Sequence, residues 1–287
     1  MKRTAFTPWL FLAPALVATV LLVLGPVTET LWLSLHDVVL FRPRVRPFVG
    51  LGNYIAVLHD PTFWSSLSLS FVWVAVAVGF QFALGLTAAL LLNRQFWWRP
   101  AARALIIVPW ALPSVIIGLI WTWMLDFNLG IINQLGVQFG LLDASVPWLA
   151  QPSTAMAAVI LAITWQGFPF FCVTLLAGLQ SIPREQYEAA AIDGAGPVRS
   201  FYYVTIPGLM PVMSTALLLR MIWVANSLDL LLVMTGGGPG TSTQTLPLYA
   251  FLTAWSGANY GYGSALAVML TLMLLSVVIF YAVRSGK

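Results

Sequence analysis

Arg220 stands out chemically because it lies deep inside a long apolar stretch of the chain. A charge at that depth in a membrane costs about 3 kcal/mol or more unless it faces a cavity or a partner. Asp229, the nearest acid of the same predicted helix, is nine residues away and out of reach along the helix. A structural ion pair with another helix or subunit is one interpretation. A solute cavity is the one that we favour.

Trp223 and Ser227 follow Arg220 at helical spacing and are predicted to lie on the same face. This face offers a guanidinium group, an aromatic ring and a hydroxyl group. Sugar hydroxyls pair with such polar groups, and the C–H faces of a sugar ring stack on aromatic rings. The three residues therefore predict a site for a sugar or a similar solute.

A second group of candidates lies beside Pro169, where Gln166, Gly167 and Phe170 supply an amide, a small residue and a ring. Aromatic residues at helical spacing usually pack in a core. A glutamine in the middle of a membrane span, however, needs hydrogen-bond partners or a cavity. We therefore add Gln166, Gly167 and Phe170 to the predicted solute site.

The segment of about 181–207 is too polar to cross a membrane. Pro183 can begin a helix whose first turn favours the nearby acids Glu185 and Glu188, and Gly194 can end it. A second short helix is predicted near Pro197. An alanine-rich face with acids at one end suits a partner's groove better than anionic lipid, although an ordinary interfacial loop is the alternative.

The sequence lacks the residue patterns that catalysis, metal binding and nucleotide binding require. The only histidines, His36 and His59, have neither metal-binding nor triad spacing, and Cys172 is the only cysteine. Lys2 and Lys287 are the only lysines, so the chain has no Walker A loop. We expect no catalytic residue, no metal site and no enzyme activity in this chain.

The composition is that of an integral membrane protein, with 60% hydrophobic and only 8% charged residues among 287. A bilayer core about 30 Å thick needs about 20 apolar residues per helix. Six stretches are long enough: Trp9 to Leu33, Leu67 to Leu92, Ala104 to Leu125, Ser153 to Leu179, Ile206 to Met234 and Tyr262 to Val283. The sequence predicts an all-α membrane protein of six transmembrane helices in a single domain, residues 1–287.

Prolines punctuate these spans at positions 14, 26, 109, 113, 169 and 211. They are either packing kinks or the breaks of discontinuous helices that line a solute cavity. No internal repeat divides the chain, whereas most secondary transporters have paired halves. This favours a half-transporter that needs a partner subunit.

The basic residues predict the orientation. With both termini in the cytoplasm, the inner segments hold Lys2, Arg3, Arg94, Arg99, Arg103, Arg184, Arg199, Arg284 and Lys287. The first outer segment holds Arg42, Arg44 and Arg46, a cluster that opposes the rule and whose role the sequence leaves open.

The polar segment also carries a family resemblance. Glu188-Ala189-Ala190, then three residues, Gly194, nine residues and Val204-Thr205-Ile206-Pro207 resembles the EAA signature of importer-type ABC permeases. Valine and isoleucine replace the usual isoleucine and leucine. The stretches Gly50 to Tyr54, Asp60 to Trp64 and Thr235 to Phe251 resemble the carbohydrate-importer branch, in particular its maltose and glycerol-phosphate first permeases.

The resemblance implies a type I ABC importer permease fold whose EAA loop is a cytoplasmic coupling helix that docks in the ATPase subunit. Glu188, Ala189, Ala190 and Gly194 carry over as coupling residues. Corresponding parts of the fourth and fifth spans line the sugar site of the maltose permease, which adds weight to the six solute-site candidates.

The resemblance further implies the partners: a second homologous permease, two ATPase subunits that bind ATP and Mg, and an extracytoplasmic solute-binding protein. The chain itself would need no cofactor and would be a multi-pass protein of the cell's inner membrane. The nucleic-acid alternative lacks any basic run.

The expected function is the import of a sugar or sugar-like solute, driven by ATP hydrolysis in the partner subunits. Glycerol-phosphate or another anionic polyol derivative is the alternative solute, because Arg220 suits an anion. A proton-coupled secondary transporter is the remote alternative, because Glu29, Asp126 and Asp229 all fall near span ends.

Overall fold

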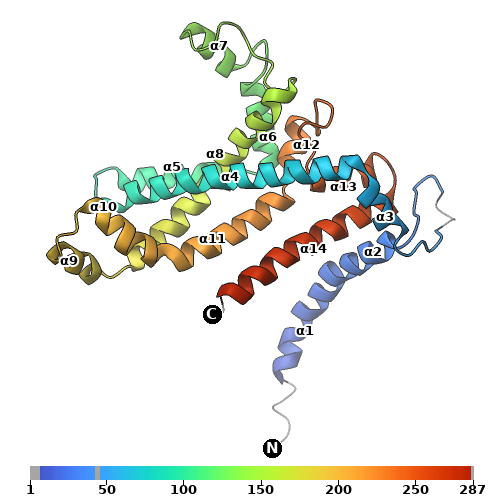
Figure 1. Ribbon diagram of the computed structural model, residues 1–287, viewed down its shortest axis with the longest axis horizontal. Coiled ribbons are helices and arrows are strands. Elements are labelled where there is room, and N and C mark those ends of the chain that lie inside the picture. The colour runs from blue at the N-terminus through green and yellow to red at the C-terminus, as the bar shows by residue number, and fades with distance from the viewer. Residues whose placement is uncertain (1–6, 43–45, 286–287) are drawn as a thin grey trace, which may run out of the picture. The chain divides into compact units, whose positions relative to one another are not determined.

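The computed structural model describes residues 7–42 and 46–285, and nearly all of these are helical (Figure 1). Their only β-structure is a pair of isolated bridges. Lys2, Arg3, Arg44 and Lys287, which contribute to the predicted charge bias, lie outside the described residues. The all-α fold class predicted from the sequence is confirmed.

The chain forms two compact units, which we describe separately. The terminal unit contains the described residues up to Ser65 together with Tyr249–Phe280, and the central unit contains Ser66–Leu248 and the chain from Tyr281. The helices α4 (Pro61–Asn93), α13 (Leu246–Trp255) and α14 (Tyr260–Ser285) contribute to both. The prediction of a single permease domain stays a prediction.

Helix α8 (Pro152–Ser181) is the centre of the central unit, and 61% of its most apolar 18-residue stretch is buried. It packs against α5 (Arg99–Ala111), α6 (Ser114–Met124), α11 (Ile206–Asn226) and α12 (Asp229–Met234). Helix α7 (Ile131–Gln138) follows α6. Helix α8 carries one half of the predicted solute site and is held against α11, which carries Arg220 and Trp223 of the other half.

The predicted third span, 104–125, is broken rather than continuous. Helix α5 ends at Ala111, α6 begins at Ser114, and the two helices meet at 96°. Pro113 explains the break, because proline excludes the helical conformation from Leu112, whose backbone is extended with ψ 139°. Of the two interpretations of the prolines, a broken helix therefore applies here.

The predicted fifth span, 206–234, is also broken, between α11 and α12. Ser227 has left the helix and has an extended backbone with ψ 116°. The last carbonyls of α11 receive side-chain donors, because Asn226 Nδ2 binds Ile222 O at 2.9 Å and Trp73 Nε1 binds Val224 O at 3.0 Å. These bonds satisfy the helix end without a further helical turn.

The polar segment forms α9 (Arg184–Ile192), as predicted from Pro183 and Gly194. The predicted second helix does not stay separate. Helix α10 (Pro197–Ser200), the π-helical turn η2 (Phe201–Thr205) and α11 follow without a break as one apolar helix, Pro197–Asn226. The π-helical turn η2 ends two residues before Pro207 and accommodates this residue, which has no N–H to donate.

The terminal unit contains α1 (Thr7–Thr19), the π-helical turn η1 (Val20–Leu24), α2 (Gly25–Ser34) and α3 (Gly52–His59). Two stretches that resemble the carbohydrate-importer branch, Gly50 to Tyr54 and Asp60 to Trp64, hold this unit together through hydrogen bonds. Asn53 Nδ2 donates to Ser34 O and His36 O at 2.9 and 3.0 Å. The carboxylate of Asp60 accepts hydrogen bonds from Tyr249 at 2.5 Å and from Tyr262 at 2.9 Å.

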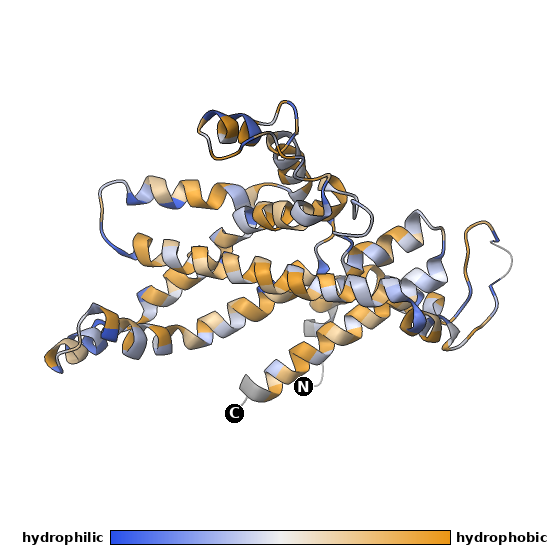
Figure 2. Cartoon of the chain, turned by 45° about the horizontal axis from the view of Figure 1, so that its top comes forward, coloured by the Kyte–Doolittle hydropathy of each residue, from blue (hydrophilic) through white to orange (hydrophobic). Residues whose placement is uncertain are grey.

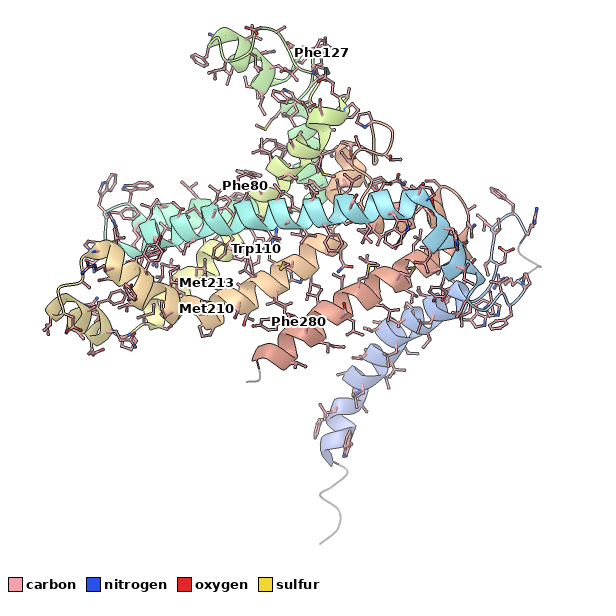
Figure 3. The ribbon with its side chains drawn as sticks, viewed as in Figure 1. Phe80, Trp110, Phe127, Met210, Met213 and Phe280 are labelled. Atoms are coloured by element: carbon pink, nitrogen blue, oxygen red, sulfur yellow. The ribbon has the colours of Figure 1, made fainter. Side chains whose placement is uncertain are left out.

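In the described residues, five helices are long and apolar enough to cross a membrane, and the broken α5–α6 pair can form a sixth span. Apolar residues run along these helices, whereas polar ones gather around α9 (Figure 2). Large side chains such as Phe80 of α4 and Phe280 of α14, both labelled in Figure 3, are 58% and 65% exposed. Such surfaces suit lipid or partner helices rather than water.

Candidate functional site

The central unit contains a cavity of about 350 Å³ at the break between α5 and α6. Four of the six predicted solute-site residues line it: Gln166, Arg220, Trp223 and Ser227. They come from α8, from α11 and from the extended residue after α11. The structure thus brings together two groups of candidates that are 54 positions apart between Gln166 and Arg220 in the sequence.

Arg220 is buried, with 8% of its surface exposed. Its Nε donates a hydrogen bond to Oε1 of Gln81 on α4 at 2.6 Å. Among the described residues no carboxylate pairs with it. The structural ion pair considered from the sequence therefore has no acidic partner in the described part of the chain.

Gly167 does not line the cavity. A Cβ atom at this position would overlap Arg220 Nη2 and would come within 2.5 Å of the Gln81 amide. The glycine leaves the space in which these two side chains meet beside α8. Gly167 therefore packs against the Arg220 side chain and does not line the cavity.

Phe170 is also absent from the cavity wall. Its ring packs edge-on against Trp223, with centroids 5.1 Å apart, and lies 6.0 Å from the ring of Trp110. Both tryptophans line the cavity, and Trp110 is at the end of α5 (Figure 3). Phe170 thus supports two aromatic walls from behind.

Gln166 Nε2 donates to Ser114 Oγ at 3.0 Å. Ser114 is the first residue of α6, so this bond joins α8 to the broken span. The amide oxygen of Gln166 has no hydrogen-bond partner among the described residues. It is one acceptor that the cavity can offer to a solute hydroxyl group.

Sequence reasoning missed Gln81 and several wall residues: Trp110, Leu112, Pro113, Ser114, Ile163 and Val224. Pro113 was an available signal, because we considered that prolines could mark a broken helix at a cavity. Gln81 was a second signal, since it is a polar residue deep in an apolar span. Only the tertiary structure pairs it with Arg220.

Helix α9 carries the predicted coupling residues. Glu188, Ala189 and Gly194 are exposed, and Ala190 is half-buried. Gly194 has φ +78°, and the bonds Gly194 N to Ala191 O and Ala195 N to Ala190 O form the Schellman end of the helix. The glycine therefore forms the expected turn, while the coupling role of the four residues stays a prediction.

A hydrogen bond connects α9 with the segment that leads into α11, the helix that carries Arg220 and Trp223. Tyr187 OH and Thr205 Oγ1 are 3.0 Å apart, and Thr205 is the last residue of η2, directly before α11. Two large side chains of these segments are exposed, Ile192 of α9 at 87% and Tyr203 of η2 at 79%. An exposed helix with apolar neighbours is a typical docking element.

Comparison with known proteins identifies the family. Residues 81–285 match the model of the binding-protein-dependent transport system inner membrane component. The chain is 38% identical to the trehalose/maltose transport system permease protein MalF of Thermococcus litoralis, over 97% of this chain and 93% of the relative. It is 37% identical to the sulfoquinovosyl glycerol transport system permease protein SmoG of Agrobacterium fabrum, over 95% and 88%.

Solved structures show the same fold. The chain matches a bacterial ABC transporter involved in the import of the acidic polysaccharide alginate with a TM-score of 0.84, at 20% identity over 98% of this chain and 95% of that one. It also matches the alginate transporter in complex with its alginate pentasaccharide-bound periplasmic protein, with a TM-score of 0.82, at 19% identity over 96% and 92%. At this identity the likeness defines the fold alone.

The fold is therefore that of a type I ABC importer permease. The chain belongs to the family of binding-protein-dependent transport system inner membrane components and is a multi-pass membrane protein. The family resemblance seen in the EAA segment is confirmed.

Proposed function

We propose that this chain is the permease subunit of an ATP-driven importer and carries a sugar or sugar-like solute through the cavity beside Arg220. The observation that carries the proposal is the composition of the cavity wall. A guanidinium group, an amide, a hydroxyl group and two tryptophan rings converge on about 350 Å³ at a helix break. Polar groups that can pair with hydroxyl groups, placed beside aromatic rings, are what sugar recognition needs.

Broken helices at mid-membrane are where transporters place solutes, because unwound backbone is tolerated there only around a cavity. The two broken spans described above, with breaks at Pro113 and at Ser227, both contribute to the wall. The curated relatives support the solute class, since one is named for trehalose and maltose and another for sulfoquinovosyl glycerol.

In this proposal α9 docks on an ATPase subunit, and the energy of ATP hydrolysis reaches the cavity through η2 and α11. Glu188 would make an acidic contact with the ATPase subunit, and the small side chains of Ala189 and Ala190 would let the two proteins approach closely. Gly194 would form the turn that ends α9. ATP and Mg bind to the ATPase subunits and not to this chain, which is itself no enzyme.

The complete importer would contain this chain, a second homologous permease, two ATPase subunits and an extracytoplasmic solute-binding protein. Both termini would lie in the cytoplasm, so that α9 faces the ATPases. A binding-protein partner is supported by one of the matching structures, which is a transporter in complex with a ligand-bound periplasmic protein.

A second candidate solute is an anionic one, such as glycerol-phosphate, another anionic polyol or an acidic sugar. Its support is that Arg220 has no carboxylate partner in the described residues and can pair with a solute anion. The sulfoquinovosyl glycerol relative points the same way.

The test is uptake by the complete complex in vesicles loaded with ATP. Radiolabelled maltose, trehalose and glycerol 3-phosphate are offered together with the binding protein of the same gene cluster. Uptake of at least one of the two disaccharides supports the proposal, and uptake of glycerol 3-phosphate alone supports the anionic alternative. Uptake that proceeds without ATP under a proton gradient would indicate a secondary transporter instead.

A further inference from the structure

Gln81 is a fully buried glutamine in the middle of the long apolar helix α4. A buried amide lowers stability unless both of its ends are hydrogen-bonded. Both ends of Gln81 are used. Oε1 accepts from Arg220 Nε at 2.6 Å, and Nε2 donates to the carbonyl oxygen of Ile163 on α8 at 2.8 Å.

The two bonds fix the direction of the amide. A main-chain carbonyl only accepts hydrogen bonds, so the NH₂ end of Gln81 must face Ile163. The oxygen end then faces Arg220, whose Nε can only donate. Gln81 thus joins three helices, α4, α8 and α11, at one point beside the cavity.

A guanidinium group has five N–H donors, and this contact uses the one on Nε. The two Nη groups have no hydrogen-bond partner among the described residues, and Arg220 lines the cavity. The planar fork formed by these groups is the part of arginine that grips two oxygen atoms at once.

We infer that Gln81 is a positioning residue, which holds Arg220 by Nε so that its Nη groups are presented to the solute. The inference rests on the proposed function, in which Arg220 contacts the solute. The neutral amide matters, because it orients the guanidinium without neutralising it. A glutamate in its place would pair with Arg220 and compete with the solute.

Gly167 completes the arrangement by leaving room for it. A methyl group at Gly167 would overlap Arg220 Nη2 and crowd the Gln81 amide, so it must displace the fork. Gly178 is a matched control on the same helix. A methyl group there would also be crowded, at 2.9 Å from Leu209 of α11, but it would touch only apolar side chains.

The test is a double-mutant cycle on the complete complex with its binding protein, in nanodiscs and in ATP-loaded vesicles. The variants are Gln81→Leu, Arg220→Ala and the pair of both. The readout is the maximal uptake rate of maltose, trehalose or glycerol 3-phosphate, whichever the wild type imports fastest. The amount of assembled complex is measured beside it.

We expect Gln81→Leu to lower uptake at least about tenfold, the factor expected for losing a hydrogen bond to a charged group. In the Arg220→Ala background the same change should have no further effect, because Gln81 acts through Arg220. Gln81→Glu should also lower uptake, although it keeps an acceptor. Gly167→Ala should resemble Gln81→Leu, and Gly178→Ala should not.

A purely structural Gln81 would give other results. Gln81→Leu would then lower assembly and uptake in parallel, and its effect would add to that of Arg220→Ala. Wild-type uptake by Gln81→Leu or by Gln81→Glu would equally overturn the inference, while leaving the proposed function intact.

If the wild-type complex imports none of the three solutes, the proposed function fails, and a structure of the Gln81→Leu complex decides on Gln81. A guanidinium group of Arg220 that has left its wild-type position supports the positioning role. A guanidinium group in the wild-type position contradicts it.

Discussion

Gln81 on α4 accepts a 2.6 Å hydrogen bond from Nε of Arg220 on α11, although 139 positions separate the two residues. Arg220, a cation within an apolar span, is therefore held by a neutral amide. Within the described residues no acid takes that role. A cation held in this way keeps its charge for a further partner, and the consequences can be measured.

Replacing Arg220 by alanine should leave the complex assembled and reduce uptake at least about tenfold. The change leaves Gln81 Oε1 without its donor, which costs about 1 to 3 kcal/mol. Removing one member of a buried ion pair would cost more, about 3 to 5 kcal/mol. Assembly, the melting temperature and uptake are measured on the same preparation.

Arg220→Lys separates charge from geometry. Lysine keeps the positive charge but has no Nε–H at the position that Gln81 binds, and it lacks the planar fork. Uptake should therefore fall with this variant too. Wild-type uptake by Arg220→Lys would show that the charge alone suffices, whereas wild-type uptake by Arg220→Ala would remove Arg220 from the site and leave Gln166, Trp223 and Ser227 as candidates.

Gly194→Val should uncouple hydrolysis from uptake. Gly194 has φ +78°, and valine is strained there by about 1 to 2 kcal/mol, so the end of α9 must change shape. Gly196→Val is the matched control, because Gly196 has φ −72° and ψ 175°, which valine accepts readily. A Cβ atom meets no neighbour at either position, so crowding is equal.

The measurement for this pair is solute imported per ATP hydrolysed. Gly194→Val should lower that ratio at least about tenfold, and Gly196→Val should keep it near the wild-type value. Normal assembly and a wild-type ratio in Gly194→Val would remove Gly194 from the coupling residues.

The terminal unit should lose stability in acid through Asp60. Burial alone would raise the pKa of Asp60, but the hydrogen bonds from Tyr249, from the Thr62 backbone and from Tyr262 outweigh it and lower the pKa below 3.8. A carboxyl group whose pKa is lowered by folding stabilises the fold above its ordinary pKa. This stabilisation disappears as the pH falls through the lowered pKa.

Tyr249 sets the alkaline limit of the same cluster. Burial and the hydrogen bond to Asp60 raise the pKa of Tyr249 to about 12. A raised pKa of a phenol stabilises the fold below its ordinary pKa of about 10 and is lost as the pH rises through 12. Stability from this pair should therefore be complete between about pH 4 and pH 10.

Tyr249→Phe tests the cluster directly. It should lower the melting temperature at pH 7, by an amount that corresponds to about 1 kcal/mol, and the difference from wild type should shrink at pH 3. Tyr260→Phe is the control, because the Tyr260 hydroxyl group has no hydrogen bond within the described residues. Equal shifts for both variants at pH 7 and pH 3 would contradict the assignment.

The spans and α9 were predictable because each follows from local sequence: a long apolar run, an opening proline, a closing glycine. The breaks were harder. Pro113 was one of six prolines that fitted either a kink or a break, and the α11 end depends on a donor from Trp73 to Val224, 151 positions away. Long-range side-chain contacts of this kind leave no periodic signal in the sequence.

The candidate solute site could also be predicted only in part from the sequence. Arg220, Trp223, Gln166 and Ser227 were predicted because a polar or aromatic group at membrane depth needs a reason; all four line the cavity, and their role as solute ligands stays a prediction. Gly167 and Phe170 were expected at the wall but lie behind it. Sequence spacing indicates which residues share a helix face, but not which layer around a cavity they form.

The most direct test of the central claim is uptake by purified components in proteoliposomes. This chain, its partner permease, the two ATPase subunits and the binding protein are combined with internal ATP and external maltose or trehalose. We predict accumulation that stops when ATP, the ATPase subunits or the binding protein is left out. Accumulation of either sugar by this chain alone, without ATP, would contradict the account.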